Sequence, residues 1–146
     1  MVIYIGADHA GFKLKEYLKK YLKSKKIKFE DFGTYTDKIL DDFPDFAVKV
    51  AKKVSKDKNS KGILICGTGT GMVMAANRIK GIRAALAYDK YSAVMSRRDN
   101  DANILCLRGR KINFENEKRI VNYWLNSKFS NIDRYKRRIK KIAKIK

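Results

Sequence analysis

The sequence predicts an α/β fold, in which a five-stranded parallel sheet lies between two layers of helices. Short apolar segments alternate along the chain with longer segments whose apolar residues recur every three to four positions, and this alternation is typical of strands followed by helices. The length of 146 residues is enough to bury one core, and no internal repeat or linker divides the chain. We therefore expect a single domain over residues 1–146.

Each element can be placed from its pattern of apolar residues. We expect strands at residues 3–5, 28–32, 63–65, 83–88 and 104–107. We expect helices over residues 14–22, 43–54, 72–78, 90–98, 113–125 and about 132–144. Pro44 near the first position of the second helix and Asn113 as a cap of the fifth support those two starts. In the last helix, Ile139 and Ile142 are expected to face inward.

The charge of the chain is strongly positive, with 35 lysines and arginines against 15 acidic residues and a formal net charge of +20. Such an excess can indicate nucleic-acid binding. However, lysine is spread over most of the expected helices, and no zinc-finger, basic-zipper or RNA-recognition pattern occurs. We interpret the charge as a solvated lysine-rich surface and expect no specific nucleic-acid partner. A nucleic-acid-binding module on the same fold is the alternative.

Targeting signals and cysteines bear on the compartment. No apolar run approaches the roughly 18 residues of a membrane span, and the segment that begins at Met1 has the pattern of a first strand rather than of a signal peptide. We therefore expect no membrane partner, a cytoplasmic location and reduced thiols. Of the two cysteines, Cys106 is assigned to the core, whereas Cys66 ends an apolar strand.

The strongest chemical signal is the glycine-rich turn that follows the central strand. This turn consists of Cys66, Gly67, Thr68, Gly69, Thr70 and Gly71. A strand, a glycine-rich turn and a helix start form a layout in which backbone N–H groups converge on an anion. A thiol beside that positive pole is favoured as the thiolate, so the segment predicts a general base next to an anion site. The alternative is a tight turn with a small core cysteine.

Two other polar segments lie at strand ends. Asp8 and His9 follow the first strand, and residues 99–103 precede the fifth. Chemistry in parallel sheets gathers at the carboxyl ends of the strands, so we expect one cleft to collect Asp8, His9 and the Cys66 turn, with residues 99–103 reaching in from a helix end. The bland alternatives are a helix cap for Asp8 and a structural role for His9, the sole histidine.

Three local patterns together suggest a family: Gly-Ala-Asp8-His9-Ala-Gly, Ile-Cys66-Gly-Thr-Gly-Thr-Gly71 and Ser96-Arg-Arg-Asp-Asn100-Asp-Ala-Asn103. With Gly81-Ile-Arg-Ala84 and spaced arginines in the last helix, the chain resembles the type B ribose-5-phosphate isomerases, a family that includes galactose-6-phosphate and allose-6-phosphate isomerases. The likeness runs through nearly the whole chain. It implies a Rossmann-like fold, a homodimer or tetramer with active sites shared between subunits, and no metal or cofactor.

The resemblance also implies a reaction. The chain would interconvert ribose 5-phosphate and ribulose 5-phosphate, a step of the pentose phosphate pathway, through a cis-enediolate; a six-carbon sugar phosphate is the alternative substrate. Cys66 would be the base, and the Thr68 hydroxyl and the N–H groups of residues 67–71 would hold the enediolate oxygen. Some relatives use a glutamate after the last glycine of the turn, where this chain has Met72, which cannot titrate.

Further residues are implied to bind the substrate. Asp8 would meet sugar hydroxyls, and His9 would lie near the phosphate. Arginines bind phosphate through two parallel hydrogen bonds, and Arg134 and Arg138, four positions apart, share one helix face. A solvated basic helix is the alternative for that face. The complete set of implied substrate-binding residues is Asp8, His9, Gly67, Gly69, Thr70, Gly71, Asn100, Arg110, Arg134 and Arg138.

The chain departs from the family pattern at two positions. Members usually have a histidine that opens the furanose ring where this chain has Asp99, and a glycine where it has Arg108. An aspartate can relay the same proton only if burial keeps it protonated. Three possibilities follow: Asp99 is the catalytic group, another group or water opens the ring, or the substrate differs.

Overall fold

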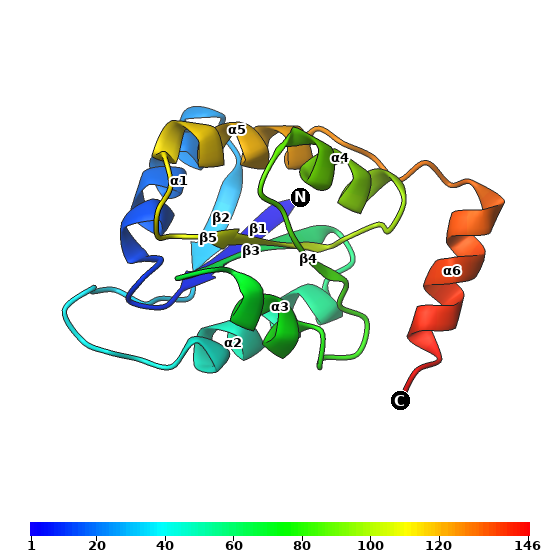
Figure 1. Cartoon of the computed structure of the whole chain (residues 1–146), viewed down its shortest axis with the longest axis horizontal. Coiled ribbons are helices and arrows are strands. Elements are labelled where there is room, and N and C mark those ends of the chain that lie inside the picture. The colour runs from blue at the N-terminus through cyan, green and yellow to red at the C-terminus, as the bar shows by residue number, and fades with distance from the viewer.

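The computed structural model describes all 146 residues and contains the predicted alternation of strands and helices (Figure 1). The elements are β1 (Val2–Ala7), α1 (Phe12–Ser24), β2 (Lys28–Asp31), α2 (Phe43–Lys56), β3 (Ser60–Cys66), α3 (Thr70–Ala76), β4 (Ala84–Leu86), α4 (Lys90–Arg98), β5 (Ile104–Arg108), α5 (Phe114–Leu125) and α6 (Asp133–Ala143). All strand pairs are parallel, in the order β2-β1-β3-β5-β4. The predicted α/β class with a five-stranded parallel sheet is confirmed.

Helices cover both faces of the sheet, because the central strand β3 has apolar side chains on both faces. Ile63 and Ile65 of β3 pack in the apolar cluster on the side of α1, α4 and α5, whereas Leu64 and Cys66 pack in the cluster on the side of α2 and α3 (Figure 1). Successive side chains of a strand point to opposite faces, so a strand buried on both sides becomes a continuous apolar run. None of the helices is both long enough and apolar enough to cross a membrane.

Helix α3 starts two residues earlier than predicted, at Thr70. Its N-cap, Gly69, has φ +80°, and a Cβ placed there would lie 2.6 Å from the Leu86 side chain. Only glycine combines that left-handed conformation with such a close contact. The cap predicted for α5 is confirmed, because the Asn113 side chain accepts a hydrogen bond from Glu115 N at 2.9 Å.

Helix α6 stands apart from the rest of the chain, at the end of a linker that follows α5 (Figure 1). The linker is attached to the end of α4, where Ser130 Oγ donates a hydrogen bond to the Arg98 carbonyl at 2.8 Å. No residue of α6 is buried: Ile142 is 51% exposed, and Ile139 is only half-buried. The prediction that these two isoleucines face inward is therefore wrong within one chain, since that face meets none of its own core.

The order of the strands places a crevice between β1 and β3. From β1 the chain passes to β2 on one side, and then crosses to β3 on the other, so the loops after β1 and β3 diverge at the carboxyl edge of the sheet. Two glycines allow the loop after β1 to lie close to β3 and to the loop after β5. A Cβ on Gly11 would lie 2.5 Å from the Ile65 carbonyl oxygen, and one on Gly109 would lie 2.5 Å from that of Ala10.

A buried ion-pair network joins α1 to the end of β2. The Lys15 side chain is 0% exposed, and its Nζ lies 2.6 Å from Asp31 Oδ2 and 3.1 Å from a Glu16 oxygen. Lys19 Nζ lies 2.7 Å from the same Asp31 oxygen. Burial opposes ionisation of Asp31, but hydrogen bonds from Lys15, Lys19 and the Gly33 N–H outweigh it and lower the pKa of the Asp31 carboxyl.

This network predicts unequal effects for its two partners. Asp31→Asn leaves Lys15 buried without its nearest anion, so we expect the free energy of unfolding in urea to fall by about 3 kcal/mol. Lys15→Met removes the buried cation, while Asp31 keeps Lys19, and we expect a clearly smaller loss. Equal losses of unfolding free energy in the two variants would contradict the view that Lys15 is buried because Asp31 pairs with it.

The same pair carries a pH signature. Because the pKa of Asp31 in the folded chain lies below its ordinary value of 3.8, its contribution is fully present above pH 3.8 and is lost as the pH falls through the lowered value. The difference in unfolding free energy between the wild type and Asp31→Asn should thus be constant near neutral pH and shrink in acid. If the difference in unfolding free energy between the wild type and Asp31→Asn grew in acid, the lowered pKa of Asp31 would be contradicted.

Candidate active site

Asp8 closes the turn between β1 and α1. It is buried, and its Oδ1 accepts hydrogen bonds from Ala10 N at 3.0 Å and Gly11 N at 3.1 Å. Asp8 thus closes the turn before α1, whose N-cap is Gly11 and has no side-chain hydrogen bond. Burial raises the pKa of the Asp8 carboxyl, although the Gly11 and Ala10 hydrogen bonds act in the opposite direction. Asp8 N also donates to the Ile65 carbonyl at 3.1 Å, which ties this turn to β3.

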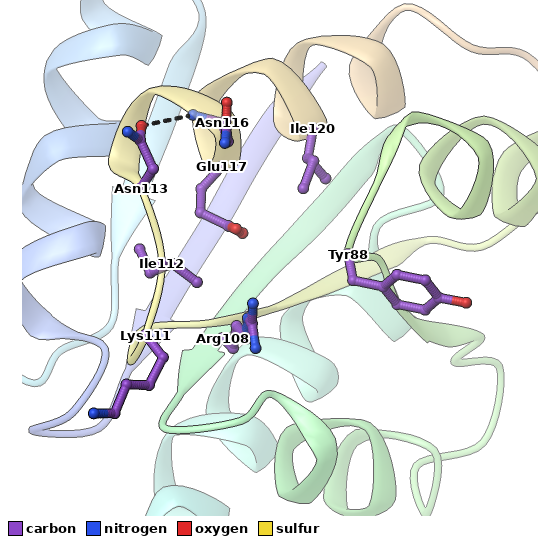
Figure 2. Close-up of a pocket in the computed structure, with 8 residues that line it drawn as sticks. All are labelled: Tyr88, Arg108, Lys111, Ile112, Asn113, Asn116, Glu117 and Ile120. Carbon is purple, nitrogen blue, oxygen red and sulfur yellow. Dashed lines mark hydrogen bonds between the residues drawn. The ribbon is translucent and has the colours of Figure 1, made fainter.

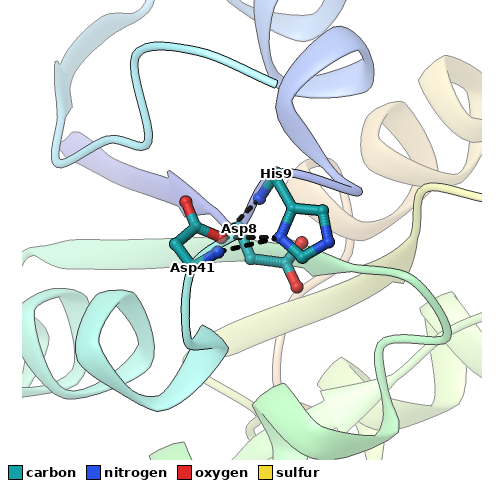
Figure 3. Close-up of side chains that lie close together, drawn as sticks. All are labelled: Asp8, His9 and Asp41. Atoms are coloured by element: carbon teal, nitrogen blue, oxygen red, sulfur yellow. Dashed lines mark hydrogen bonds and ion pairs between the residues drawn. The ribbon is translucent and has the colours of Figure 1, made fainter. Parts of the chain in front are cut away.

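His9 is held by Asp41, a residue from the segment before α2 (Figure 3). One oxygen of the Asp41 carboxylate accepts a hydrogen bond from His9 N and lies 2.8 Å from the ring Nδ1. Partial burial opposes ionisation of Asp41, but hydrogen bonds from His9 and the Thr34 side chain lower its pKa. The pair fixes the imidazole and leaves Nε2 as its unengaged nitrogen. The sequence analysis missed Asp41, because 32 positions separate it from His9 and no local spacing links them.

The sulfur of Cys66 faces the glycine-rich turn. Gly69 N donates a hydrogen bond to Cys66 Sγ at 3.2 Å, and the residue is 4% exposed at the carboxyl end of β3. A donor aimed at the sulfur stabilises negative charge on it. Thr70 N donates to Thr68 Oγ1 at 3.3 Å, and both threonines are exposed. The predicted contact of a thiol with the turn amides is therefore present.

Cys106 has the contrasting environment. It is fully buried on β5, and burial, with a smaller effect of the nearby Cys66 sulfur, raises the pKa of its thiol well above the ordinary value. Its assignment to the core is confirmed. Both cysteines are free.

A cavity of about 640 Å³ opens beside the turn. It is lined by Gly67, Thr68, Leu86, Ala87, Tyr88, Arg108, Arg110 and Lys111. The Arg110 side chain crosses Gly67 so closely that a Cβ there would lie 3.3 Å from Arg110 Nη1. Gly71 packs against the Phe43 ring, 2.6 Å from where its Cβ would be, so this glycine serves packing as well as the turn.

Four of the predicted site residues lie elsewhere. Asp99 and Asn100 precede the amino end of β5, whereas Cys66 pairs in register with Arg108 at the carboxyl end. A strand of this length separates the two ends by about 13 Å or more. Arg134 and Arg138 lie on α6. The expectation that one cleft of a single chain collects all three loops is therefore wrong.

These four residues form a second group, the distal cluster of Asp99, Asn100, Arg134 and Arg138. Arg134 Nη2 donates to the Tyr135 hydroxyl at 3.0 Å, and this hydrogen bond, with a smaller contribution from Asp99, raises the pKa of Arg134. The guanidinium groups of both arginines lie over the Tyr135 ring, at 4.7 and 5.7 Å from its centre, so they share one side of α6 as predicted.

Two arginines, Arg83 and Arg97, hold the loop that carries Asp99 and Asn100 through its next residue, Asp101. Asp101, in the left-handed region with φ +48°, accepts from Arg97 Nη1 and Arg83 Nη2, each at 2.9 Å. Both carboxylate oxygens are thus engaged. These two hydrogen bonds hold the backbone of the loop in place.

One group of residues has the donor types of a cation site. Asp8, His9 and Asp41 each bring one potential ligand atom, and these atoms lie within 4.8 Å of one another (Figure 3). However, Asp8 Oδ1 and Asp41 Oδ1 already accept the hydrogen bonds described above. That no metal or cofactor takes part stays a prediction.

Known proteins share this arrangement over nearly the full chain. A sequence profile of the Ribose/Galactose Isomerase family matches residues 3–142. The chain is 44% identical to the ribose-5-P isomerase B of Listeria innocua, over 89% of this chain and 87% of that protein. It is 40% identical to the D-erythrulose-4-phosphate isomerase 2 of Mycolicibacterium smegmatis, over 87% and 85%.

A solved structure agrees as closely. The ribose-5-phosphate isomerase B of Mycoplasma genitalium with bound ribulose 5-phosphate superposes with a TM-score of 0.93 at 41% identity, over 97% of this chain and 93% of that one. A profile match to nearly every residue, together with identities of this size, shows descent as well as shape. The chain therefore belongs to the ribose/galactose isomerase family, and it is an isomerase.

Proposed function

We propose that the chain interconverts ribose 5-phosphate and ribulose 5-phosphate with Cys66 as the base. The observation that carries the proposal is the 3.2 Å hydrogen bond from Gly69 N to Cys66 Sγ at the carboxyl edge of the sheet. It places the Cys66 sulfur beside a backbone N–H donor, an arrangement suited to a base for proton transfer at carbon. The relative with bound ribulose 5-phosphate supports the choice of substrate.

The reaction needs one base and no redox partner. The thiolate takes the proton from C2 of the open-chain aldose, the electron pair of that bond forms the C1–C2 double bond, and the π pair of the C1 carbonyl moves onto O1 to give a cis-enediolate. The O2 hydroxyl then gives its proton to O1, and return of the carbon-bound proton from the Cys66 thiol to C1 gives the ketose. The N–H groups of residues 67–71 and the Thr68 hydroxyl hold the charge that develops on oxygen. One such donor contributes about 3 kcal/mol to lowering the barrier.

The remaining residues of the carboxyl edge hold the substrate. Asp8 uses Oδ1 for its turn, which leaves Oδ2 for sugar hydroxyls. His9, oriented by Asp41, and Arg110, which crosses Gly67, are placed to receive a phosphate. A guanidinium group and an imidazole donor are both suited to phosphate oxygens.

We infer that the site is completed by a second copy of the chain. The distal cluster holds two arginines, Arg134 and Arg138, a residue type suited to phosphate, but lies at the opposite edge of the sheet from Cys66. Helix α6 also carries an apolar side that meets nothing in its own chain. In a two-fold dimer, α6 of each subunit covers the other and brings its arginines to the other site.

A four-carbon sugar phosphate is the second candidate substrate, and Asp99 favours it. A four-carbon aldose 4-phosphate has its C4 oxygen esterified and cannot close a furanose ring, so its isomerase needs no ring-opening histidine. One relative is named for D-erythrulose 4-phosphate. With a pentose phosphate, Asp99 or water would have to open the ring. A six-carbon sugar phosphate is the third candidate.

We further infer that the enzyme works in the cytoplasm, as a step of the pentose phosphate pathway. Cys66 must stay a free thiol to act as the base, and a reducing compartment maintains free thiols. A disulfide or an oxidised sulfur at this position would remove the base.

Cys66→Ala is the direct test of the base. We expect it to abolish exchange of the substrate C2 proton with deuterated solvent, measured by NMR, because the variant lacks the sulfur that takes this proton. Cys106→Ala is the matched control and should keep exchange, since this thiol is buried in the core. Undiminished exchange in Cys66→Ala would remove Cys66 from the role.

Mixing two inactive variants tests the shared site. Cys66→Ala and Arg138→Ala should each be inactive alone, but a mixed dimer has one site with both wild-type residues. After unfolding and refolding together in equal amounts, about a quarter of the wild-type activity should return, given one active site in half of the dimers. If Cys66 and Arg138 of the same chain form the site, mixing restores nothing.

A substrate panel combined with Asp99→His separates the candidates. We compare kcat/KM for four-, five- and six-carbon aldose phosphates, and expect ribose 5-phosphate to be the best substrate. Asp99→His should raise turnover of ribose 5-phosphate, whose ring must open, and leave the four-carbon substrate unchanged. A clear preference of the wild type for the four-carbon phosphate would replace the first candidate by the second.

A further inference from the structure

The carboxyl group of Glu117 lacks the partner that its burial demands. Glu117 lies in the first turn of α5 and is 5% exposed, and its Oε2 has no hydrogen-bond partner. Burial raises the pKa of this carboxyl to about 7, although the Arg108 guanidinium lowers it in part. A buried polar atom without a partner is costly and uncommon in folded proteins, and the isomerase mechanism has no use for this one.

Glu117 borders a cavity of about 440 Å³ between the start of α5, the end of β5 and Tyr88 (Figure 2). In Figure 2 its side chain points from α5 into this space, towards Arg108 on β5. The cavity is within the size range of pockets that bind small molecules. Its lining residues are Tyr88, Arg108, Lys111, Ile112, Asn113, Asn116, Glu117 and Ile120.

The lining defines the chemistry of an occupant. Arg108 and Lys111, both exposed, bring two positive charges to the rim, and the start of α5 adds the positive end of a helix dipole. Deeper in, Glu117 Oε2 can accept a hydrogen bond that nothing in the chain provides. A fitting molecule therefore has an anionic group for the rim and a hydroxyl group for Glu117.

We propose that this cavity is a second binding site, which takes a small hydroxylated anion of the polyol phosphate type. It adjoins the 640 Å³ cavity beside the Cys66 turn, and Tyr88, Arg108 and Lys111 line both. The proposal rests on the proposed function only in treating that neighbouring cavity as the isomerase site. The two sites differ in their lining, since Glu117 borders one and Gly67 and Thr68 border the other.

Calorimetric titration with glycerol 3-phosphate tests the proposal. This probe carries a phosphate and two hydroxyls but no carbonyl, so the enzyme cannot isomerise it. We expect two binding events per chain in the wild type. Glu117→Leu, which replaces the carboxyl by an apolar group, should weaken one event by about tenfold or more, the effect of one hydrogen bond to a charged group. Arg108→Gln, a change at an exposed position that borders both cavities, should weaken both events.

The control variant is Glu115→Gln, two residues away on the same turn. Glu115 bonds Lys118 and Tyr17 and does not border the cavity, so both events should remain. A single event per chain in the wild type, or two unchanged events in Glu117→Leu and Arg108→Gln, would overturn the proposal. Failure of the proposed function has a different readout: absence of isomerase activity in a protein that still shows the Glu117-dependent event.

Discussion

The close approach of three strand ends, those of β1, β3 and β5, is the constraint on which the site depends. Asp8 N donates to the Ile65 carbonyl, and Gly109 N donates to the Cys66 carbonyl at 2.7 Å, so the loops after the three strands are bonded to one another. Gly11 and Gly109 make this possible, because a Cβ on either would collide with backbone atoms. Asp8, Cys66 and Arg110 thus share one edge as a result of backbone geometry.

The direction of the chain also explains why the predicted site residues are divided between two edges of the sheet. In a parallel sheet, each loop before a strand lies at the edge opposite to the loops that follow strands. Residues 99–103 precede β5, so they cannot reach the Cys66 turn of their own chain, and α6 leaves the domain from that same side. The proposed two-fold partner would bring these residues to the Cys66 turn of the other chain without any change of fold.

Most of the fold could be predicted from the sequence, because local patterns determine it. Ile63, Leu64 and Ile65 indicate a buried strand, and the glycine-rich turn after them indicates an anion site. The His9–Asp41 pair could not be predicted, because 32 residues separate the two and only the packing of α2 brings them together. The inward face of α6 was predicted wrongly for a related reason: periodicity reveals an apolar side, but does not identify the surface that covers it.

Two buried charges show how satisfied and unsatisfied groups differ. Lys15 has no exposed side-chain surface, yet it contacts Asp31 and Glu16, and its pairing accounts for its burial. Glu117 is equally enclosed, but Arg108, its nearest cation, is exposed to solvent and forms no ion pair with it. A stable fold tolerates a buried charge that its own chain neutralises, as around Lys15. Where the chain leaves the partner missing beside an open cavity, the missing partner is most simply a ligand, and this distinction separates the structural network of α1 from the proposed binding site under α5.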